Sequence, residues 1–371
     1  MSNVIDIRDR LRGPFTGPAV WHGPDLADRD EWVLRLSSRQ TTELRTALTT
    51  ARPRGTTLPR AAAADFPLPA LAGELERAAE DLASGRGWVL IKGVPVRELS
   101  EADAGAVLRA IGQYLGWPVP QDPHGHALRH VRDTGGTAPG ATATGYRTRA
   151  RVPFHTDESD LLGLLCLRPA CSDAVTSLVS SAAVHNALAD LRPDLVQRLY
   201  RNHFFDRRDQ HAPGERPYLA APLATRYGAA LSMRYDRDRL EAARSLTGVP
   251  RPEPADTELY DLVDSLADSP RLRLDLHLEA GDLLLVDNHS VMHARPEFED
   301  FDDPERGRHL LPLRLARHRD TDPPGTAAVR GPRAKAMRRE IASRDVIRPR
   351  SLHATRPGHE SRDRRPHRGD G

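Results

Sequence analysis

Short apolar runs separated by turn residues dominate the chain between residues 88 and 316, and such runs are typical of β-strands. The first run, at 88–94, reads WVLIKGV and follows a glycine turn. Because there is little strand–helix–strand alternation, the pattern favours an antiparallel barrel or jelly roll over a doubly wound parallel sheet. Strands are expected at 88–94, 152–157, 161–168, 176–180, 218–223, 229–235, 272–278, 283–287, 290–294 and 308–316.

Helical periodicity, with apolar residues three and four positions apart, is concentrated before residue 85 and recurs between the predicted strands. Ser100, with Asp103 three residues later, predicts an N-cap for one of these helices. The helices are expected at 30–36, 42–51, 71–82, 104–115, 181–191, 193–200, 239–246 and 257–267. We therefore expect an α+β protein with a mainly β core, which N-terminal and inserted helices cover.

Three regions follow from these patterns. Residues 1–85 are expected to form a helical N-terminal region packed on the core, and residues 86–316 a jelly-roll domain. Residues 317–371 lose the pattern and have the composition of a disordered basic tail. Within the central domain, residues 116–151 are rich in Pro, Gly, His and Thr. An irregular stretch of that length predicts either a functional loop or a disordered one.

The charge is unevenly distributed, although the 371 residues carry a formal net charge of only +2. Residues 317–371 contain 15 Lys and Arg but 7 Asp and Glu, a net of +8, so residues 1–316 carry a net of −6. The tail contains no Phe, Tyr or Trp on which bases could stack. We therefore expect a solvated tail, and a nucleic-acid-binding arm remains the less favoured alternative.

Membrane and disulfide-rich secreted proteins are excluded as classes by the rest of the composition. No apolar run approaches the about 18 residues of a membrane helix, and the first residues lack the pattern of a secretory signal. Cys166 and Cys171 are too few for a disulfide framework. We therefore expect a cytoplasmic protein with no membrane partner, while the oligomeric state stays open.

The most informative candidate chemistry is the His155–Thr156–Asp157 segment, where a predicted strand emerges from the loop. Alternate residues of a strand point to the same face, so the imidazole and the carboxylate can converge on one ion. Two histidines and one carboxylate are the facial triad that holds Fe(II). Similar pairs, His277 with Glu279 and His318 with Asp320, are more simply explained as a solvated strand face and a segment beyond the last strand.

A third ligand has to come from a distant strand. Residues 281–295 read GDLLLVDNHSVMHAR, in which a glycine turn, an apolar strand, a polar break and a second strand follow one another. His293 lies in the second strand and is the favoured ligand. His289 shares its strand parity and remains the rival, although its place in the polar break suits a turn residue better.

These segments resemble the taurine dioxygenase family, in the branch similar to clavaminate synthase. The resemblance rests on VPFHTDESDLLGLLCLRPA at 152–170, GDLLLVDNHSVMHARPEFED at 281–300 and DPERGRHLLPLRL at 303–315, and it extends to GRGWVLIKGVPV at 85–96. It implies a double-stranded β-helix that uses Fe(II), 2-oxoglutarate and O2. It also implies that His155, Asp157 and His293 are the iron ligands.

The resemblance further implies which residues bind 2-oxoglutarate. Arg308, fifteen residues after His293, matches the arginine that pairs with the C5 carboxylate, and Thr176 matches the hydroxyl beside it. Four residues after Arg308 the family commonly has a second arginine, but this chain has Pro312. The resemblance implies that this second arginine binds the anionic group of a taurine-like substrate. Without it, a taurine-like anion at that position is disfavoured. Arg314, which shares the strand parity of Arg308, is the candidate substitute in binding an anion.

The implied activity is hydroxylation of an unactivated C–H bond in a small amino-acid-like or natural-product intermediate, with release of succinate and CO2. Desaturation or cyclisation at the same iron site, and a non-catalytic jelly-roll binding protein, remain alternatives. Retention of Asp157 disfavours halogenation, which needs a small residue at that position. Gln121 and Tyr146, in the polar loop, are the candidate contacts to the substrate.

Overall fold

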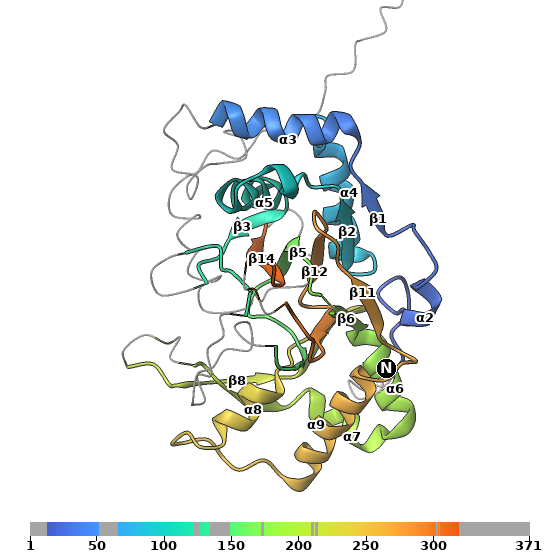
Figure 1. Ribbon diagram of the computed structural model, residues 1–371. Helices are drawn as coiled ribbons and strands as arrows, with labels where there is room; N and C mark the ends of the chain where they lie inside the picture. The colour runs from blue at the N-terminus through green and yellow to red at the C-terminus, as the bar shows by residue number, and fades with distance from the viewer. Residues whose placement is uncertain are drawn as a thin grey trace, which may run out of the picture.

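Two sheets packed face to face form the centre of the computed structural model (Figure 1). The larger sheet has six strands and the smaller has four. This confirms the mainly β core of an α+β protein, and the two layers agree with the expected jelly roll. The structure describes residues 13–51, 66–121, 126–133, 149–171, 174–208, 211, 214–301, 303 and 305–318.

The strand order of the larger sheet brings together segments far apart in the sequence. All neighbouring strands are antiparallel except β1 and β2, which are parallel. In order across this sheet lie β1 (Val33–Arg35), β2 (Trp88–Lys92), β12 (Leu283–Asp287), β5 (Leu161–Arg168), β14 (His309–Arg317) and β3 (Gly116–Pro118). The smaller sheet contains, in order, β11 (Leu274–His277), β6 (Val175–Ser180), β13 (Val291–Arg295) and β4 (Val152–His155).

Strand alternation divides the apolar side chains of the larger sheet between two cores. Leu310 of β14 belongs to a cluster between the sheets, together with Trp88 of β2 and Leu178 of β6. Leu311 and Leu313, on the opposite face, pack against helices. This alternation explains why nearly every residue of β14 is buried.

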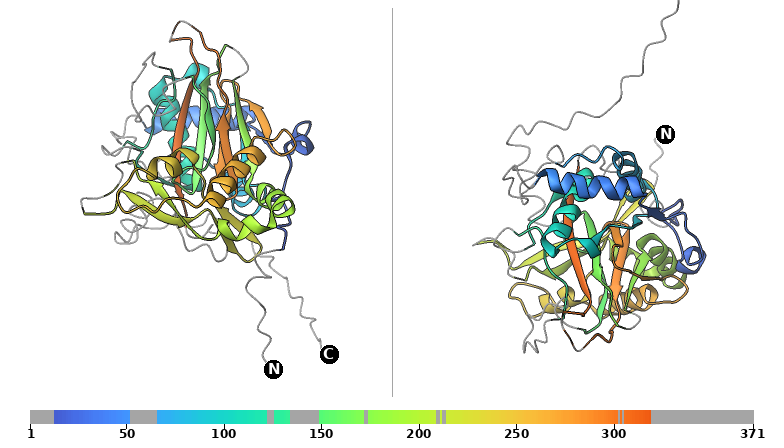
Figure 2. Two further views of the ribbon diagram at one scale, coloured as in Figure 1. Left: turned by 90° about the horizontal axis from the view of Figure 1, so that it is seen from below. Right: turned by 45° about the horizontal axis from the view of Figure 1, so that its top comes forward.

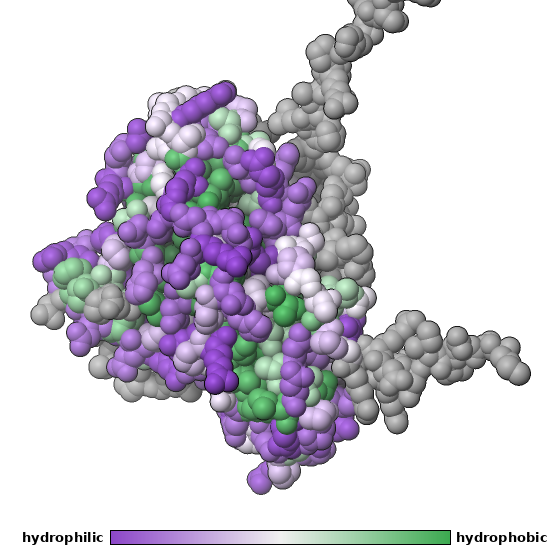
Figure 3. Space-filling model, turned by 90° about the vertical axis from the view of Figure 1, so that its right-hand side faces the viewer, coloured by the Kyte–Doolittle hydropathy of each residue, from purple (hydrophilic) through white to green (hydrophobic). Residues whose placement is uncertain are grey.

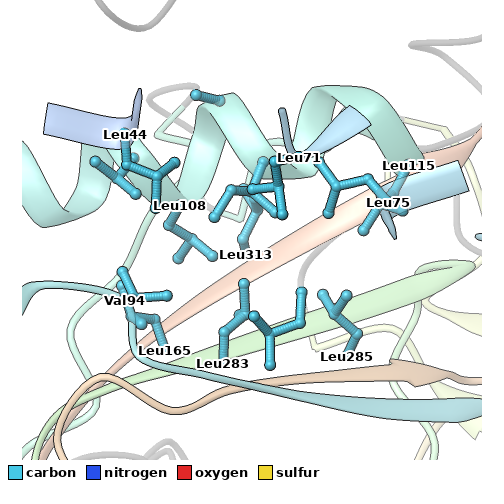
Figure 4. Close-up of a cluster of buried hydrophobic side chains, with 14 of the residues drawn as sticks. Leu44, Leu71, Leu75, Val94, Leu108, Leu115, Leu165, Leu283, Leu285 and Leu313 are labelled. Carbon is cyan, nitrogen blue, oxygen red and sulfur yellow. The ribbon is translucent and has the colours of Figure 1, made fainter. Parts of the chain in front are cut away.

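Three helices cover the outer face of the larger sheet (Figure 1). They are α3 (Ser38–Ala51), α4 (Ala72–Ser84) and α5 (Glu101–Leu115), and the Ser100 hydroxyl caps α5 by accepting the Asp103 N–H, as predicted. Figure 4 shows leucines of the helices and of the sheet pointing toward one another. Burial of each such side chain contributes about 1.5–3 kcal/mol to folding, so this layer holds the sheet in shape.

The outer face of the smaller sheet is covered by the chain that connects β6 to β11 (Figure 2). Val179 and Met292 of the sheet pack there against apolar residues of the inserted helices. This insertion contains α6 (Ser181–Leu191), α7 (Pro193–Leu199), β7 (Asn202–Asp206), β8 (Tyr218–Pro222), β9 (Ala224–Tyr227), β10 (Ala230–Met233), α8 (Arg237–Ala243) and α9 (Pro254–Ala267). Two short elements lie elsewhere, α2 (Gly23–Leu26) and η3 (Val96–Glu98).

One predicted helix is wrong. Residues 30–36 do not form a helix, because Val33–Arg35 pairs in parallel with β2 as strand β1. The stretch with apolar residues three and four positions apart is short there. Helix formation therefore does not outweigh backbone hydrogen bonding with the edge of the sheet. Short strands such as β7, which reads NHFFD, escaped prediction because polar residues flank a very short apolar centre. The domain boundaries at 85 and 316 remain predictions.

The surface on the side shown in Figure 3 is largely hydrophilic, with only small hydrophobic patches. Among the described residues, Leu191 is the one large hydrophobic side chain that is mostly exposed, at 62%. No helix in the described part of the chain is long and apolar enough to cross a membrane. Most of the predicted tail, residues 319–371, lies outside the described residues.

Candidate metal centre

His155, Asp157 and His293 converge at one end of the smaller sheet. His155 is the last residue of β4, Asp157 follows two residues later, and His293 lies in β13. Antiparallel pairing sets His293 directly opposite His155, with ring centroids 4.3 Å apart. One donor atom from each of the three side chains lies within 4.8 Å of the other two. The structure thus brings together the three residues that the sequence singled out.

Thr156 points away from this group, as strand alternation predicts. Its side chain is 4% exposed, and its hydroxyl accepts the Tyr235 N–H at 3.1 Å. The Thr156 N–H in turn donates to the Tyr235 carbonyl at 2.8 Å. These bonds hold the segment between the two ligand candidates against the inserted chain, so that His155 and Asp157 face the other side.

The donor set fits a divalent metal. Nδ1 of His155 lies 2.8 Å from the Pro153 carbonyl, so it carries a proton and leaves Nε2 for coordination. Burial lowers the pKa of His293 to about 3, which keeps this imidazole neutral. Its Nδ1 is buried without a hydrogen-bond partner among the described residues. Two neutral imidazoles and a carboxylate are the ligands of the non-haem Fe(II) triad.

Asp157 is held in its ionised form by a cation. Burial favours the neutral acid, but the positive charge and hydrogen bond of Arg314, together with the neighbouring His293 and His155, outweigh it and hold the pKa of Asp157 below its ordinary value. Nη2 of Arg314 lies 2.5 Å from Oδ1 of Asp157. Arg314 thus contacts a candidate metal ligand directly, a contact that the sequence did not predict.

His289, the rival ligand, does not join the group. Its Nε2 faces Oδ1 of Asp160 at 3.0 Å and its Nδ1 faces the Ser232 hydroxyl at 2.8 Å. Both ring nitrogens of this turn residue therefore have partners from elsewhere in the chain, one just before β5 and one in β10. Of the other pairs, His277 is exposed on β11, while Nε2 of His318 faces the Gln113 carbonyl at 2.9 Å.

Asn288 connects the two halves of the triad, and sequence reasoning missed it. This fully buried side chain accepts the Asp157 N–H at its Oδ1, at 3.0 Å, and donates from Nδ2 to the Ser159 hydroxyl at 3.2 Å. It therefore ties the segment that carries Asp157 to the turn that leads to His293. The only signal in the sequence was the polar break between two apolar strands.

Replacing Asn288 by alanine is expected to weaken iron binding about tenfold or more, because partners that orient a ligand are typically worth that much. Asn186→Ala is the matched control, since Asn186 also makes two amide hydrogen bonds, with the backbone of Phe15, away from the triad. Both variants should lose about 1–3 kcal/mol of unfolding free energy. Iron titration should separate them, and equal iron affinities would contradict the positioning role of Asn288.

Arg308 and Thr176 lie on the inner side of the two sheets. Thr176 shares the face of Leu178, which is the register partner of His293, so Thr176 lies two positions further along β6 on the same face. Arg308 precedes β14 and is 5% exposed. Its guanidinium lies over the Phe298 ring, 5.3 Å from the centroid, and forms no ion pair with any described carboxylate. Burial lowers its pKa. A buried cation of this kind fits an anionic ligand.

Of the two candidate substrate contacts, the structure describes only Gln121. Gln121 is 5% exposed, and its Nε2 donates to the carbonyls of Ala127 and Pro312, at 2.7 and 2.8 Å. Its amide nitrogen thus supports the backbone beside β14. Tyr146 lies outside the described residues.

Comparison with known proteins identifies relatives of the whole domain. The model of the family described as "Taurine catabolism dioxygenase TauD, TfdA family" matches residues 51–313. FR-33289 synthase of Streptomyces rubellomurinus is 30% identical over 307 residues, which are 82% of this chain and 90% of the relative. The uridine-5'-phosphate dioxygenase of a Streptomyces species is 29% identical over 241 residues, covering 58% of this chain and 81% of the relative.

Solved structures share the fold. Asparagine oxygenase in complex with Fe(II), 3-hydroxyasparagine and succinate matches with a TM-score of 0.61 and 18% identity, over 85% of this chain and 98% of that one. The non-haem iron oxygenase OrfP in complex with Fe and alpha-ketoglutaric acid matches with a TM-score of 0.55 and 19% identity, over 76% and 94%. At these identities the likeness concerns the fold.

Proposed function

Since the chain belongs to the taurine catabolism dioxygenase TauD, TfdA family, we propose that His155, Asp157 and His293 hold the Fe(II) of this 2-oxoglutarate-dependent oxygenase. The observation that carries the proposal is the convergence of their donor atoms within 4.8 Å. When bound, the iron would activate O2, the oxidant that breaks an unactivated C–H bond, while 2-oxoglutarate would supply two electrons through its decarboxylation to succinate and CO2.

Arg308 and Thr176 would hold the distal carboxylate of 2-oxoglutarate. A planar guanidinium binds a carboxylate through two parallel hydrogen bonds and so fixes its orientation. Burial of Arg308 strengthens such a bond by excluding water, and Thr176 would add a hydroxyl donor. Support comes from the burial of both residues and from the position of Thr176, two residues along β6 from the register partner of His293.

Arg314, which the sequence suggested as a substitute in binding an anion, would act mainly as a positioning residue. Its charge-assisted hydrogen bond to Oδ1 leaves the other carboxylate oxygen of Asp157 for the metal. Because the Arg314 side chain is still 28% exposed, it can also present positive charge to an anionic group of a bound molecule. A role of this kind would compensate in part for the absence of an arginine at Pro312.

We propose a small amino-acid-like or natural-product intermediate as the substrate, with hydroxylation as the reaction. Support comes from the relatives and structural neighbours, which include a synthase, a nucleotide dioxygenase and oxygenases crystallised with hydroxylated asparagine or arginine. Desaturation or cyclisation would use the same iron site and differ only in the product.

Succinate release tests this function. The protein should be incubated with Fe(II), 2-oxoglutarate and O2, alone and with a panel of amino acids, amino-acid conjugates and nucleotides. We expect iron-dependent succinate formation that a subset of the panel stimulates, and a product heavier by one oxygen atom. A product lighter by two hydrogen atoms would instead indicate desaturation or cyclisation. Absence of iron-dependent succinate, even at the uncoupled background, would favour the non-catalytic alternative.

A further inference from the structure

A second group of one carboxylate and two imidazoles lies apart from the triad. Glu101 is the first residue of α5, His130 lies in the segment that bridges to β14, and His309 is the first residue of β14. One donor atom from each lies within 4.8 Å of the other two. The proposed oxygenase function uses none of these three residues.

The distances within this group suit a shared ion. Nδ1 of His130 faces Nε2 of His309 at 2.8 Å, and the same Nδ1 lies 3.8 Å from Oε2 of Glu101. Nδ1 of His309 lies 3.2 Å from Oε1 of Glu101. Two histidines and a glutamate, from three separate parts of the chain, are a ligand set that zinc proteins use.

His309 is a neutral imidazole, as a metal ligand has to be. Its side chain is fully buried, and burial lowers its pKa to about 4, so the ring is neutral at neutral pH. Nδ1 accepts a hydrogen bond from Nη2 of Arg168 at 3.2 Å, so Nε2 carries the proton and donates to Nδ1 of His130 at 2.8 Å. A metal ion would replace the proton on Nε2, and Nδ1 would then carry the proton and face Oε1 of Glu101, 3.2 Å away. A carboxylate at the second ring nitrogen is the usual arrangement around a metal-ligating histidine.

Arg168 is the competing cation, and it lies on one side of the carboxylate. Its Nη1 is 3.5 Å from Oε1 of Glu101 and its Nη2 is 3.2 Å from Nδ1 of His309. Its Nε donates to the Gly307 carbonyl at 3.3 Å. The Oε2 atom of Glu101 faces His130 instead. A metal ion at the Oε2 side and the guanidinium at the Oε1 side can therefore share one carboxylate.

We propose that Glu101, His130 and His309 form a second metal site, which takes a borderline divalent cation such as Zn²⁺. The ion joins the start of α5, the segment beside β14 and the start of β14. His309 directly follows Arg308, so the ion also fixes the point where the chain leaves the cosubstrate arginine. Solvent completes the coordination, because Glu101 and His130 are partly exposed.

Zn²⁺ titration in the absence of the iron triad tests the site. The parent is the tag-free full-length chain carrying His155→Ala and Asp157→Ala, titrated with Zn²⁺ against a chromophoric chelator. Introducing His130→Ala or Glu101→Gln should weaken the tightest Zn²⁺ binding at least tenfold and abolish the rise in melting temperature that Zn²⁺ gives. His22→Ala is the matched control, since His22 is as exposed as His130, at 49% against 47%, and also lies near a carboxylate.

The other histidines of the chain contribute the same background Zn²⁺ binding in all these variants. A difference in Zn²⁺ affinity between variants therefore reports on the proposed site. Equal Zn²⁺ affinity in the parent, the His130→Ala variant and the Glu101→Gln variant would overturn the proposal. X-ray absorption of the parent loaded with one equivalent of Zn²⁺ gives an independent readout. Two imidazole ligands and carboxylate or water oxygens are expected, whereas a sulfur ligand or fewer imidazoles would contradict the site.

Discussion

The His155→Ala variant is expected to lose Fe(II)-dependent succinate formation by about a thousandfold or more. The imidazole supplies one of three protein ligands, and a bound metal contributes several kcal/mol to the chemistry it supports, where each 1.36 kcal/mol is tenfold in rate. His155 is only partly buried, so the fold should survive its truncation. Succinate formation at saturating 2-oxoglutarate, with the melting temperature measured in parallel, checks this result.

His277→Ala provides the control for that variant. His277 belongs to the other His-x-carboxylate pair on a strand, but its side chain is exposed on β11 and far from the triad in the sheet order. It should retain full succinate formation. Comparable losses in both variants, or substantial activity in His155→Ala, would remove His155 from the ligand set.

Replacing Arg308 by leucine is expected to raise the 2-oxoglutarate concentration for half-maximal rate by about a hundredfold. Removing one partner of a buried, hydrogen-bonded charge pair costs about 2–5 kcal/mol, and here the partner is the distal carboxylate. Arg308→Lys should give an intermediate value, because lysine keeps the charge but not the bidentate geometry. Steady-state kinetics with varied 2-oxoglutarate, and iron titration to show unchanged metal affinity, would measure the effect.

Arg295 is the matched control for Arg308. Both guanidiniums are buried and lie over the Phe298 ring, but Nη2 of Arg295 donates to the Ala150 carbonyl at 2.6 Å. Arg295→Leu should therefore affect stability more than 2-oxoglutarate binding. If the 2-oxoglutarate concentration for half-maximal rate rose more in Arg295→Leu than in Arg308→Leu, the cosubstrate role would belong to Arg295.

Local patterns in the sequence were sufficient to predict which way neighbouring side chains point within one short segment. Alternation along the strand expected at 152–157 correctly predicted that Thr156 would turn away from His155 and Asp157, although β4 itself ends at His155. The parity of His289 and His293 could not separate them, because the choice depends on which one faces β4. Only the register of β13 against β4, with His293 opposite His155, resolves it.

Contacts between distant segments account for what the sequence could not predict. Asn288 lies in the polar break between two apolar strands, and its role arises from a hydrogen bond to Asp157, 131 positions away. Glu101, His130 and His309 carry no common motif and meet only because α5 covers β14. Gln121 shows the converse, since this polar residue of the predicted loop was a candidate substrate contact but donates hydrogen bonds to backbone carbonyls. Residue type alone does not distinguish such support from contact with a substrate.

The assignment of the iron site depends on simultaneous binding of Fe(II) and 2-oxoglutarate at His155, Asp157 and His293. Anaerobic visible absorption measures that binding, since chelation of Fe(II) by the keto acid gives a charge-transfer band that neither component gives alone. We expect the band in the native protein with both components and its absence in His155→Ala. A native protein without the band, or a His155→Ala variant with an unchanged band, would contradict the assignment.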